Sequence, residues 1–259
     1  SAASDVYKRQ ALDPLYTFGV KQVPTKDTVI SAQGCEWKIF KELADKLNKR
    51  ELTGHAARDA INLVMSSATA EQWNGFYRRI LIKDLRCGVS EKTVNSVAKK
   101  NKFGKYMVPV FTCQLAHDSA NHEKKLVGKK MLEVKLDGVR TLAIVHPDGK
   151  VDMLSRNGKE FTNFGHIQDE ISAVVKQDPP PYPLVLDGEV MSENFQDLMK
   201  QVHRKGSADA KDAVLHLFDF IPLEEFKKGS WDKTQTQRTA MLKAWYQKHE
   251  TNLNAVTVL

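Results

Sequence analysis

The sequence predicts an α+β protein, in which a helical N-terminal bundle precedes a region with a mixed or antiparallel sheet. Between Glu36 and Lys100 the apolar residues recur at three- and four-residue steps, the spacing of one helix face. Residues 101–109 contain Gly104 and Pro109, which are typical of a linker. Beyond this linker, short apolar runs typical of strands alternate with helical stretches.

Four helices are expected in the first region. The second opens at Thr53, a residue type that caps helix N-termini. Thr69 and Gln72 form a capping-box pattern at the start of the third helix. We expect that helix to end near Gly88, because glycine tolerates the left-handed turn after a helix. Ser90 is expected to cap the fourth helix.

The second region contains short runs of β-branched and other apolar residues. Asp148-Gly149 between two of them is a hairpin signal. Helical spacing recurs at Ile167–Val175, Phe195–Val202 and Thr234–Gln247. Strands are predicted at Met131–Val134, Val139–Val145, Val151–Leu154, Leu184–Leu186 and Val214–Phe220.

Composition excludes several classes of protein. The 259 residues suffice for two ordinary domains, and a hydrophobic fraction of 41% indicates a buried core rather than global disorder. No apolar run approaches the roughly 18 residues that cross a bilayer, so no membrane partner is expected. Cys35, Cys87 and Cys113 are scattered and odd in number, which fits reduced thiols and an intracellular chain.

The net charge of +7 is compatible with a polyanionic partner. Lysine and arginine contacts to phosphates release condensed counterions and so favour binding to nucleic acid. A solvated basic face is the alternative explanation. Basic residues cluster around the fourth helix and the linker: Lys83, Arg86, Lys92, Lys99, Lys100, Lys102 and Lys105.

Both ends of the sequence have unusual features. The first ten residues do not lead into the pattern that follows, and we interpret them as an artefact or a tag. Residues 252–259 resemble the start of a strand with nothing after it for pairing. We therefore expect the chain to be truncated at both ends.

A possible catalytic lysine lies in residues 133–140, which read Glu-Val-Lys-Leu-Asp-Gly-Val-Arg. Lys135 is expected at the end of a strand, just before a turn at Gly138. A nucleophilic lysine must lose its proton, which partial desolvation and a nearby cation promote. Arg140 is a candidate for that cation and for binding a phosphate with its planar fork. A surface lysine beside a turn aspartate explains the same four-residue pattern.

Three further segments carry polar residues at the ends of, or inside, predicted strands. Residues 155–158 read Ser-Arg-Asn-Gly, which is also compatible with a polar turn. Asp187-Gly188-Glu189 lies in an apolar strand, where buried acids imply a nearby cation, ribose hydroxyl or metal. A tight turn with solvated acids is the alternative there. Phe218-Asp219 lies in an apolar strand and is compatible with a core position.

The order of these four segments resembles the first four motifs of the covalent nucleotidyltransferases, and within them the ATP-dependent DNA ligases. Leu52-Thr53-Gly54 and residues 78–90 resemble the helical DNA-binding domain of bacteriophage and eukaryotic ligases. The bacteriophage kind, with a compact helical domain, is the closer match. The resemblance covers Tyr16 to Leu259.

The resemblance implies a function for each matching residue. Lys135 is similar to the nucleophile that attacks the α-phosphorus of ATP and forms lysyl-AMP. Glu133 would contact the adenine amino edge, and Phe218 would stack on the ring. Asp137 and Asp187 would shape turns. Arg140 and Arg156 would hold ribose or phosphate, and Glu189 would contact ribose or position a Mg²⁺.

The resemblance also implies a domain plan. Residues 11–104 would form a helical DNA-binding domain, and residues 105–259 a partial nucleotidyltransferase (adenylation) domain with an ATP-grasp-like sheet. The family continues past the Phe-Asp segment to a Glu-Gly motif, a Lys-x-Lys pair and an OB-type domain, and the sequence stops before these would appear. We therefore expect these residues alone to be inactive. ATP and Mg²⁺ would be the cofactors, and nicked double-stranded DNA the partner of a monomer.

Two other functions remain compatible with the motifs. RNA ligases and capping-type guanylyltransferases share Lys-x-Asp-Gly, although they rarely carry a helical domain like the one predicted at 36–100. A non-catalytic module that binds nicks through its basic residues is the second alternative. Labelled nucleotides distinguish the enzymes, because only the correct one attaches covalently.

Overall fold

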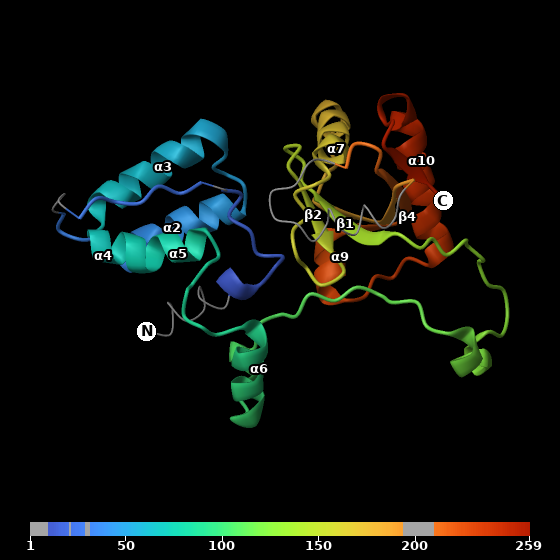
Figure 1. The fold of residues 1–259 in the computed structure, drawn as a ribbon, viewed down its shortest axis with the longest axis horizontal. Coiled ribbons are helices and arrows are strands. Elements are labelled where there is room, and N and C mark those ends of the chain that lie inside the picture. The colour runs from blue at the N-terminus through green and yellow to red at the C-terminus, as the bar shows by residue number, and fades with distance from the viewer. Residues whose placement is uncertain (1–9, 21, 29–31, 194–209) are drawn as a thin grey trace. The chain divides into compact units, whose positions relative to one another are not determined.

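A computed structural model describes residues 10–20, 22–28, 32–193 and 210–259. The chain forms two compact units, which meet in the sequence between Phe111 and Thr112 (Figure 1). Each unit has its own hydrophobic core. No helix in the described part of the chain is long and apolar enough to cross a membrane.

The first unit consists of helices and connecting segments in its described residues. The capping box of Thr69 and Gln72 and the Ser90 cap form as predicted, and the Thr53 side chain makes no capping bond. Phe40 and Tyr77 stack with ring centroids 4.3 Å apart in the core. The helices are α2 (Trp37–Asn48), α3 (Gly54–Ser67), α4 (Ala70–Gln72), the π-helical η1 (Trp73–Tyr77), α5 (Arg78–Leu81), α6 (Glu91–Lys100) and the 3₁₀ turn η2 (Gly104–Tyr106).

The helix predicted to reach Gly88 ends much earlier, at Leu81. Lys83 adopts a left-handed conformation with φ of 56°. The N–H of Lys83 donates to the carbonyl of Ile80, and the next N–H, of Asp84, donates to that of Arg79. This is the Schellman pattern, which terminates a helix by satisfying its last carbonyls. The prediction was wrong because a lysine occupies the position where glycine is usual.

Lys26 holds an N-terminal segment of the chain to the end of α3. Its side chain is buried, and its ammonium donates to the carbonyls of Met65, Ser66 and Ala68 at 3.0, 2.7 and 2.6 Å. These carbonyls lie at the C-terminal end of the helix, where the backbone dipole favours a positive charge. The Lys26 backbone also exchanges two hydrogen bonds with the Asn74 amide group. The first unit is therefore held together by the hydrogen bonds of Lys26 as well as by its hydrophobic core.

The second unit is built on one five-stranded sheet in the order β2-β1-β3-β4-β5. All neighbouring strands are antiparallel except β4 and β5, which are parallel. The predicted hairpin at Asp148-Gly149 joins β1 and β2, and Gly149 has a φ of 84°. The strands are β1 (Val139–Val145), β2 (Val151–Ser155), β3 (Leu184–Met191), β4 (Val214–Pro222) and β5 (Val256–Val258).

Helices complete this unit and cover one face of the sheet. Residues of α7 and α10 share the core with residues from the sheet, and both helices lie on the same side of it in Figure 1. The predicted helix at Phe195–Val202 lies outside the described residues. The helical elements are α7 (Gly165–Gln177), α9 (Leu223–Lys228), α10 (Gln235–His249) and the 3₁₀ turns η3 (Ser119–Asn121), η4 (Glu123–Lys125) and η5 (Glu250–Asn252).

Four of the five strand predictions are confirmed, and Met131–Val134 is wrong because this segment forms no strand. Leu132 is 95% exposed and Val134 is 73% exposed. Strand β1, which follows this segment, is already paired on both sides, by β2 and β3. The strand expected within residues 252–259 forms as β5, which pairs with β4 at the edge of the sheet.

Gly188 lies where β3 and β4 approach closely. An alanine Cβ at this position would lie 2.5 Å from the carbonyl oxygen of His216 and 2.9 Å from the Leu215 side chain. The backbone of β4 cannot yield easily, so Gly188→Ala should lower the free energy of unfolding by roughly 1–3 kcal/mol. Urea denaturation measures this change. Gly75→Ala is the control, since its added Cβ meets nothing within 4 Å. Wild-type stability in Gly188→Ala would contradict the prediction.

Candidate active site

A cavity of about 460 Å³ in the second unit is lined by residues of β1, β3 and β4 and of the segment before β1. Arg140 is on β1, Glu189 on β3 and Phe218 on β4, and Arg156 follows β2. The sheet order places these strands side by side, so residues far apart in the sequence converge. All six side chains singled out from the sequence line this cavity: Glu133, Lys135, Arg140, Arg156, Glu189 and Phe218.

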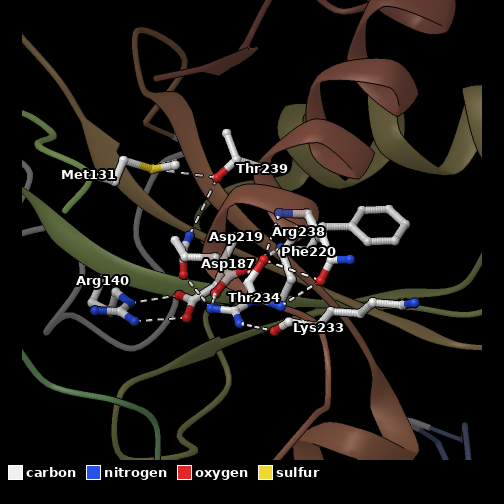
Figure 2. A network of polar contacts seen from close by, with 11 residues as sticks. Met131, Arg140, Asp187, Asp219, Phe220, Lys233, Thr234, Arg238 and Thr239 are labelled. Carbon is white, nitrogen blue, oxygen red and sulfur yellow. Dashed lines mark hydrogen bonds and ion pairs between the residues drawn. The ribbon is translucent and has the colours of Figure 1, made fainter. Parts of the chain in front are cut away.

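Arg140 forms a buried ion pair with Asp187. Its Nε and Nη2 donate to the two carboxylate oxygens at 2.6 and 2.7 Å (Figure 2). The Arg140 side chain is 21% exposed and that of Asp187 is 6% exposed. Burial raises the pKa of Asp187, and the guanidinium of Arg140 opposes this effect. The cation expected near the buried acids is therefore Arg140. Asp187 shapes no turn, because it lies within β3.

Lys135 lies in an irregular, exposed segment before β1. Its side chain is 73% exposed, and its Nζ forms an ion pair with Asp137. The hydrogen bond and negative charge of Asp137 raise the pKa of Lys135. The local environment thus stabilises the ammonium form, contrary to the expectation that a nearby cation would favour the neutral amine. In this structure Lys135 is a protonated lysine at the rim of the cavity.

Glu189 is held in place by the backbone that leads into β1. Its Oε1 accepts a hydrogen bond of 3.1 Å from the N–H of Gly138. Gly138 passes so close to β3 that an added Cβ would lie 2.3 Å from the carbonyl oxygen of Val190. Partial burial raises the pKa of Glu189. Glycine is therefore needed before β1 to place this carboxylate against the backbone.

Phe218 faces the cavity because β4 contains an extra residue at this point. Asp187 is paired with Asp219, but Gly188 is paired with Leu217, which leaves Phe218 without a partner in the register. Such a bulge interrupts the alternation of side chains along a strand. Phe218 and Asp219 therefore both line cavities, whereas the flanking Leu217 and Phe220 lie in the core. The guanidinium carbon of Arg140 lies 4.6 Å from the centroid of the Phe218 ring.

A second cavity, of about 730 Å³, adjoins the first. Arg140, Phe218 and Glu133 line both. Asp219 and Arg238 line only the second, and they form a buried ion pair with distances of 2.8 and 3.0 Å. Arg238 could not be identified from the sequence, because it lies on α10 and no motif links it to Asp219.

The described residues contain no group of three or more acidic, histidine or cysteine side chains that would hold a metal ion. Two carboxylates, Glu133 and Glu189, line the cavity, and Oε1 of Glu189 already accepts a hydrogen bond from the Gly138 N–H. Mg²⁺ commonly binds through one or two carboxylates together with phosphates of a substrate. Glu189 fits that kind of site and not a site built from protein ligands alone.

Comparison with known proteins places this second unit in a family. A family model described as the ATP dependent DNA ligase domain matches residues 112–259, more than half of the chain. The chain belongs to the ATP-dependent DNA ligase family. The match begins where the second compact unit begins. The family's enzymes are DNA ligases, and the suspected resemblance is confirmed.

The relatives of this ligase chain include two curated phage proteins. The DNA ligase of Enterobacteria phage T4 is 26% identical over 200 residues, which are 75% of this chain and 37% of the relative. The DNA ligase of Enterobacteria phage T6 is 26% identical over 151 residues, 56% of this chain and 30% of the relative. The chain thus spans about a third of the length of these curated relatives.

A solved structure named Pmar-Lig_PreS3 resembles this ligase chain more closely in sequence. The two are 62% identical, with a TM-score of 0.59. The similarity covers 98% of this chain and 58% of that one.

The hydrogen bond and charge of Asp137 raise the pKa of Lys135, so removal of this carboxylate should have an effect of predictable sign. Asp137→Asn should lower the pKa of Lys135, because an amide no longer stabilises the ammonium. At a fixed pH more of Lys135 is then neutral and reactive. The pH dependence of Lys135 modification by an amine-reactive reagent, followed by peptide mass spectrometry, measures this.

The matched control is Asp118→Asn, which removes an exposed carboxylate of the same unit that bonds only the Ala120 N–H among the described residues. It should leave the pH midpoint of Lys135 modification unchanged. An unchanged midpoint in Asp137→Asn as well would show that the ion pair does not set the pKa.

Proposed function

We propose that this chain is the nucleotide-binding part of an ATP-dependent DNA ligase that joins nicked double-stranded DNA through a lysyl-AMP intermediate. The observation that carries this proposal is the convergence of all six motif side chains on one cavity. Four strands or strand ends and the segment before β1 supply them. Family membership supports the same function.

Lys135 is the proposed nucleophile. Its neutral amine attacks the α-phosphorus of ATP, a nitrogen–phosphorus bond forms, and the bond to pyrophosphate breaks. The lysine proton must leave before this attack, and Asp137 is the contacting carboxylate in the structure. The AMP then passes to the 5′-phosphate of a nick, and attack by the 3′-hydroxyl seals the strand and releases AMP. Arginine is a poor substitute because its guanidinium stays protonated.

Arg140 and Arg156 are the proposed cations for the ribose and phosphates. Among the residues that the structure describes, the hydrogen bonds of Arg140 use Nε and Nη2 and leave Nη1 available. Arg140 also lines both cavities, so this nitrogen belongs to a side chain that a ligand can reach. Phosphoryl-type transfer depends mainly on positioning and on fixed positive charge around the phosphate.

Phe218 and Glu133 are the proposed contacts for adenine. Aromatic rings stack on bases without hydrogen-bond readout. Because the guanidinium of Arg140 already lies over the Phe218 ring, we propose that adenine uses the opposite face. Glu133 lines both cavities beside Phe218 and accepts hydrogen bonds, as recognition of an amino group requires.

Glu189 is proposed to contact the ribose or to hold Mg²⁺ together with the phosphates. When bound, Mg²⁺ would neutralise negative charge on the phosphate oxygens. The protein's own contribution is the position of the carboxylate, which Gly138 fixes through its N–H.

The helical residues 11–104 are proposed to bind DNA, and residues 105–259 to form the adenylation domain. Residues 99, 100 and 102 are exposed lysines at the end of α6 and just beyond it. Such side chains contact backbone phosphates without reading sequence. We further propose that the protein acts as a monomer inside the cell.

The first test concerns the covalent adduct in the full-length protein. Incubation with labelled ATP should place AMP on Lys135, as identified by peptide mass spectrometry. Lys135→Arg should abolish the label, because removal of the nucleophile leaves no group at the same position that loses a proton. Lys130→Arg serves as the matched control and should retain it. AMP on a different lysine, or attachment of GMP in place of AMP, would contradict the assignment.

The second test concerns the basic end of α6. Replacing Lys99, Lys100 and Lys102 together by glutamine should weaken binding of the full-length protein to a nicked duplex. It should also reduce the slope of log affinity against log salt by about 0.9 for each phosphate that the variant no longer neutralises. Formation of lysyl-AMP should be unaffected, since these residues lie outside the cavity.

The control removes the same charge from α2, by replacing Lys38, Lys41 and Lys46 with glutamine. Equal weakening of binding by both triple variants would mean that net charge alone matters. No weakening by the α6 variant would show that this segment does not bind DNA.

A further inference from the structure

Two aspartates and two arginines form a linked array across β3 and β4 (Figure 2). Asp187 and Asp219 are directly opposite each other in the register of the two strands, and both are buried. Arg140 from β1 makes a two-point contact with Asp187, and Arg238 from α10 makes the same kind of contact with Asp219. The two negative charges are thus neutralised separately, by arginines from different elements.

The two arginines differ in whether a guanidinium nitrogen remains free to bind a ligand. Arg238 donates from Nε and Nη2 to Asp219, from Nη1 to the carbonyl of Lys233 at 2.9 Å, and from Nη2 to the side chain of Gln235. All of its nitrogens are therefore engaged within the protein. Nη1 of Arg140, by contrast, makes no hydrogen bond to the residues that the structure describes. Arg140 is suited to bind a ligand, and Arg238 is suited to hold the protein itself.

Loss of Arg238 would leave a buried carboxylate without its cation. Asp219 lies beside Asp187, and a charged Asp219 makes ionisation of Asp187 less favourable. A buried charge without a partner has a high free energy, which favours rearrangement toward another cation. The other arginine in contact with this pair of carboxylates is Arg140, which binds Asp187. Without Arg238, Arg140 would have to neutralise two aspartates, and less of its positive charge would remain for a nucleotide.

We propose that Arg238 is a positioning residue for nucleotide binding. By neutralising Asp219, it keeps Arg140 paired with Asp187, and Nη1 of Arg140 then remains open to the ribose or phosphates. This inference rests on the proposed function of the cavity. Arg238 contacts no substrate in this scheme and acts through Asp219 and Arg140.

The same contact stabilises the bulge that directs Phe218 into the cavity. Asp219 follows Phe218 directly, and its Oδ1 also accepts the N–H of Phe220 at 2.8 Å. Arg238 binds that same oxygen from the start of α10, where Thr234 and Gln237 form a capping box. The helix start is therefore well defined, and the position of Arg238 is fixed relative to β4.

The test measures lysyl-AMP formation by the full-length protein as a function of ATP concentration. Arg238→Gln should raise the ATP concentration for half-maximal rate by about tenfold, the scale expected when one charged hydrogen bond is removed. Its maximal rate should change by less than about threefold, since Lys135 and the reacting phosphorus are untouched. Arg238→Lys retains the charge without the two-point contact and should lie between the two proteins.

A second variant distinguishes charge neutralisation from a loss of folding. Arg238→Gln combined with Asp219→Asn removes both charges and should restore the ATP requirement to within about threefold of wild type. Lys248→Gln is the matched control, because it removes the exposed Lys248–Asp178 ion pair at the other end of α10. It should leave the ATP requirement unchanged.

The outcomes separate this inference from the proposed function. A wild-type protein that forms no lysyl-AMP would overturn the proposed function itself. If wild type forms the adduct, an Arg238→Gln variant with the ATP requirement of Lys248→Gln would overturn the role of Arg238. A lower maximal rate with no change in ATP requirement, unrelieved by Asp219→Asn, would assign Arg238 a purely structural role and would overturn the proposal as well.

Discussion

Asp187 and Asp219 are buried opposite each other on neighbouring strands, where two uncompensated carboxylates would repel each other strongly. Their pairing with Arg140 and Arg238 makes this arrangement possible. Because the arginines come from β1 and α10, the same contacts connect the centre of the sheet to α10. The charge requirement of two aspartates thus determines which elements must meet at the site.

The bulge in β4 is the second constraint on the site, and it depends on the first. Without the extra residue, side chains would alternate strictly between the two faces of β4. Either Phe218 or Asp219 would then face the cavity, and the other would face the core. The extra residue allows both to line cavities while Leu217 and Phe220 remain buried. Gly188 accommodates the close approach of β4 at this point, since a larger residue would meet the carbonyl of His216.

Local sequence patterns predicted the elements whose determinants are local. The Thr69 capping box, the hairpin at Asp148-Gly149 and the cap at Ser90 depend on residues within four positions of each other. The motif residues converge on one cavity because each lies on or beside a strand of the same sheet. Predictions were wrong where a residue departs from its usual conformation, as Lys83 does, or where burial depends on sheet pairing, as it does for Met131–Val134. The partnership of Arg238 with Asp219 was not predictable, since it requires the position of α10.

The site therefore combines a preorganised part with a part that still has to be activated. Arg140, Glu189 and Phe218 are on strands and are held by an ion pair, a backbone hydrogen bond and a bulge. Lys135 is instead exposed, and Asp137 favours its protonated form. Groups that are held in place, as Arg140 and Glu189 are, stabilise developing charge without reorganisation at the moment of reaction. In the proposed reaction, Lys135 would therefore have to separate from Asp137 and lose its proton before it could act as the nucleophile.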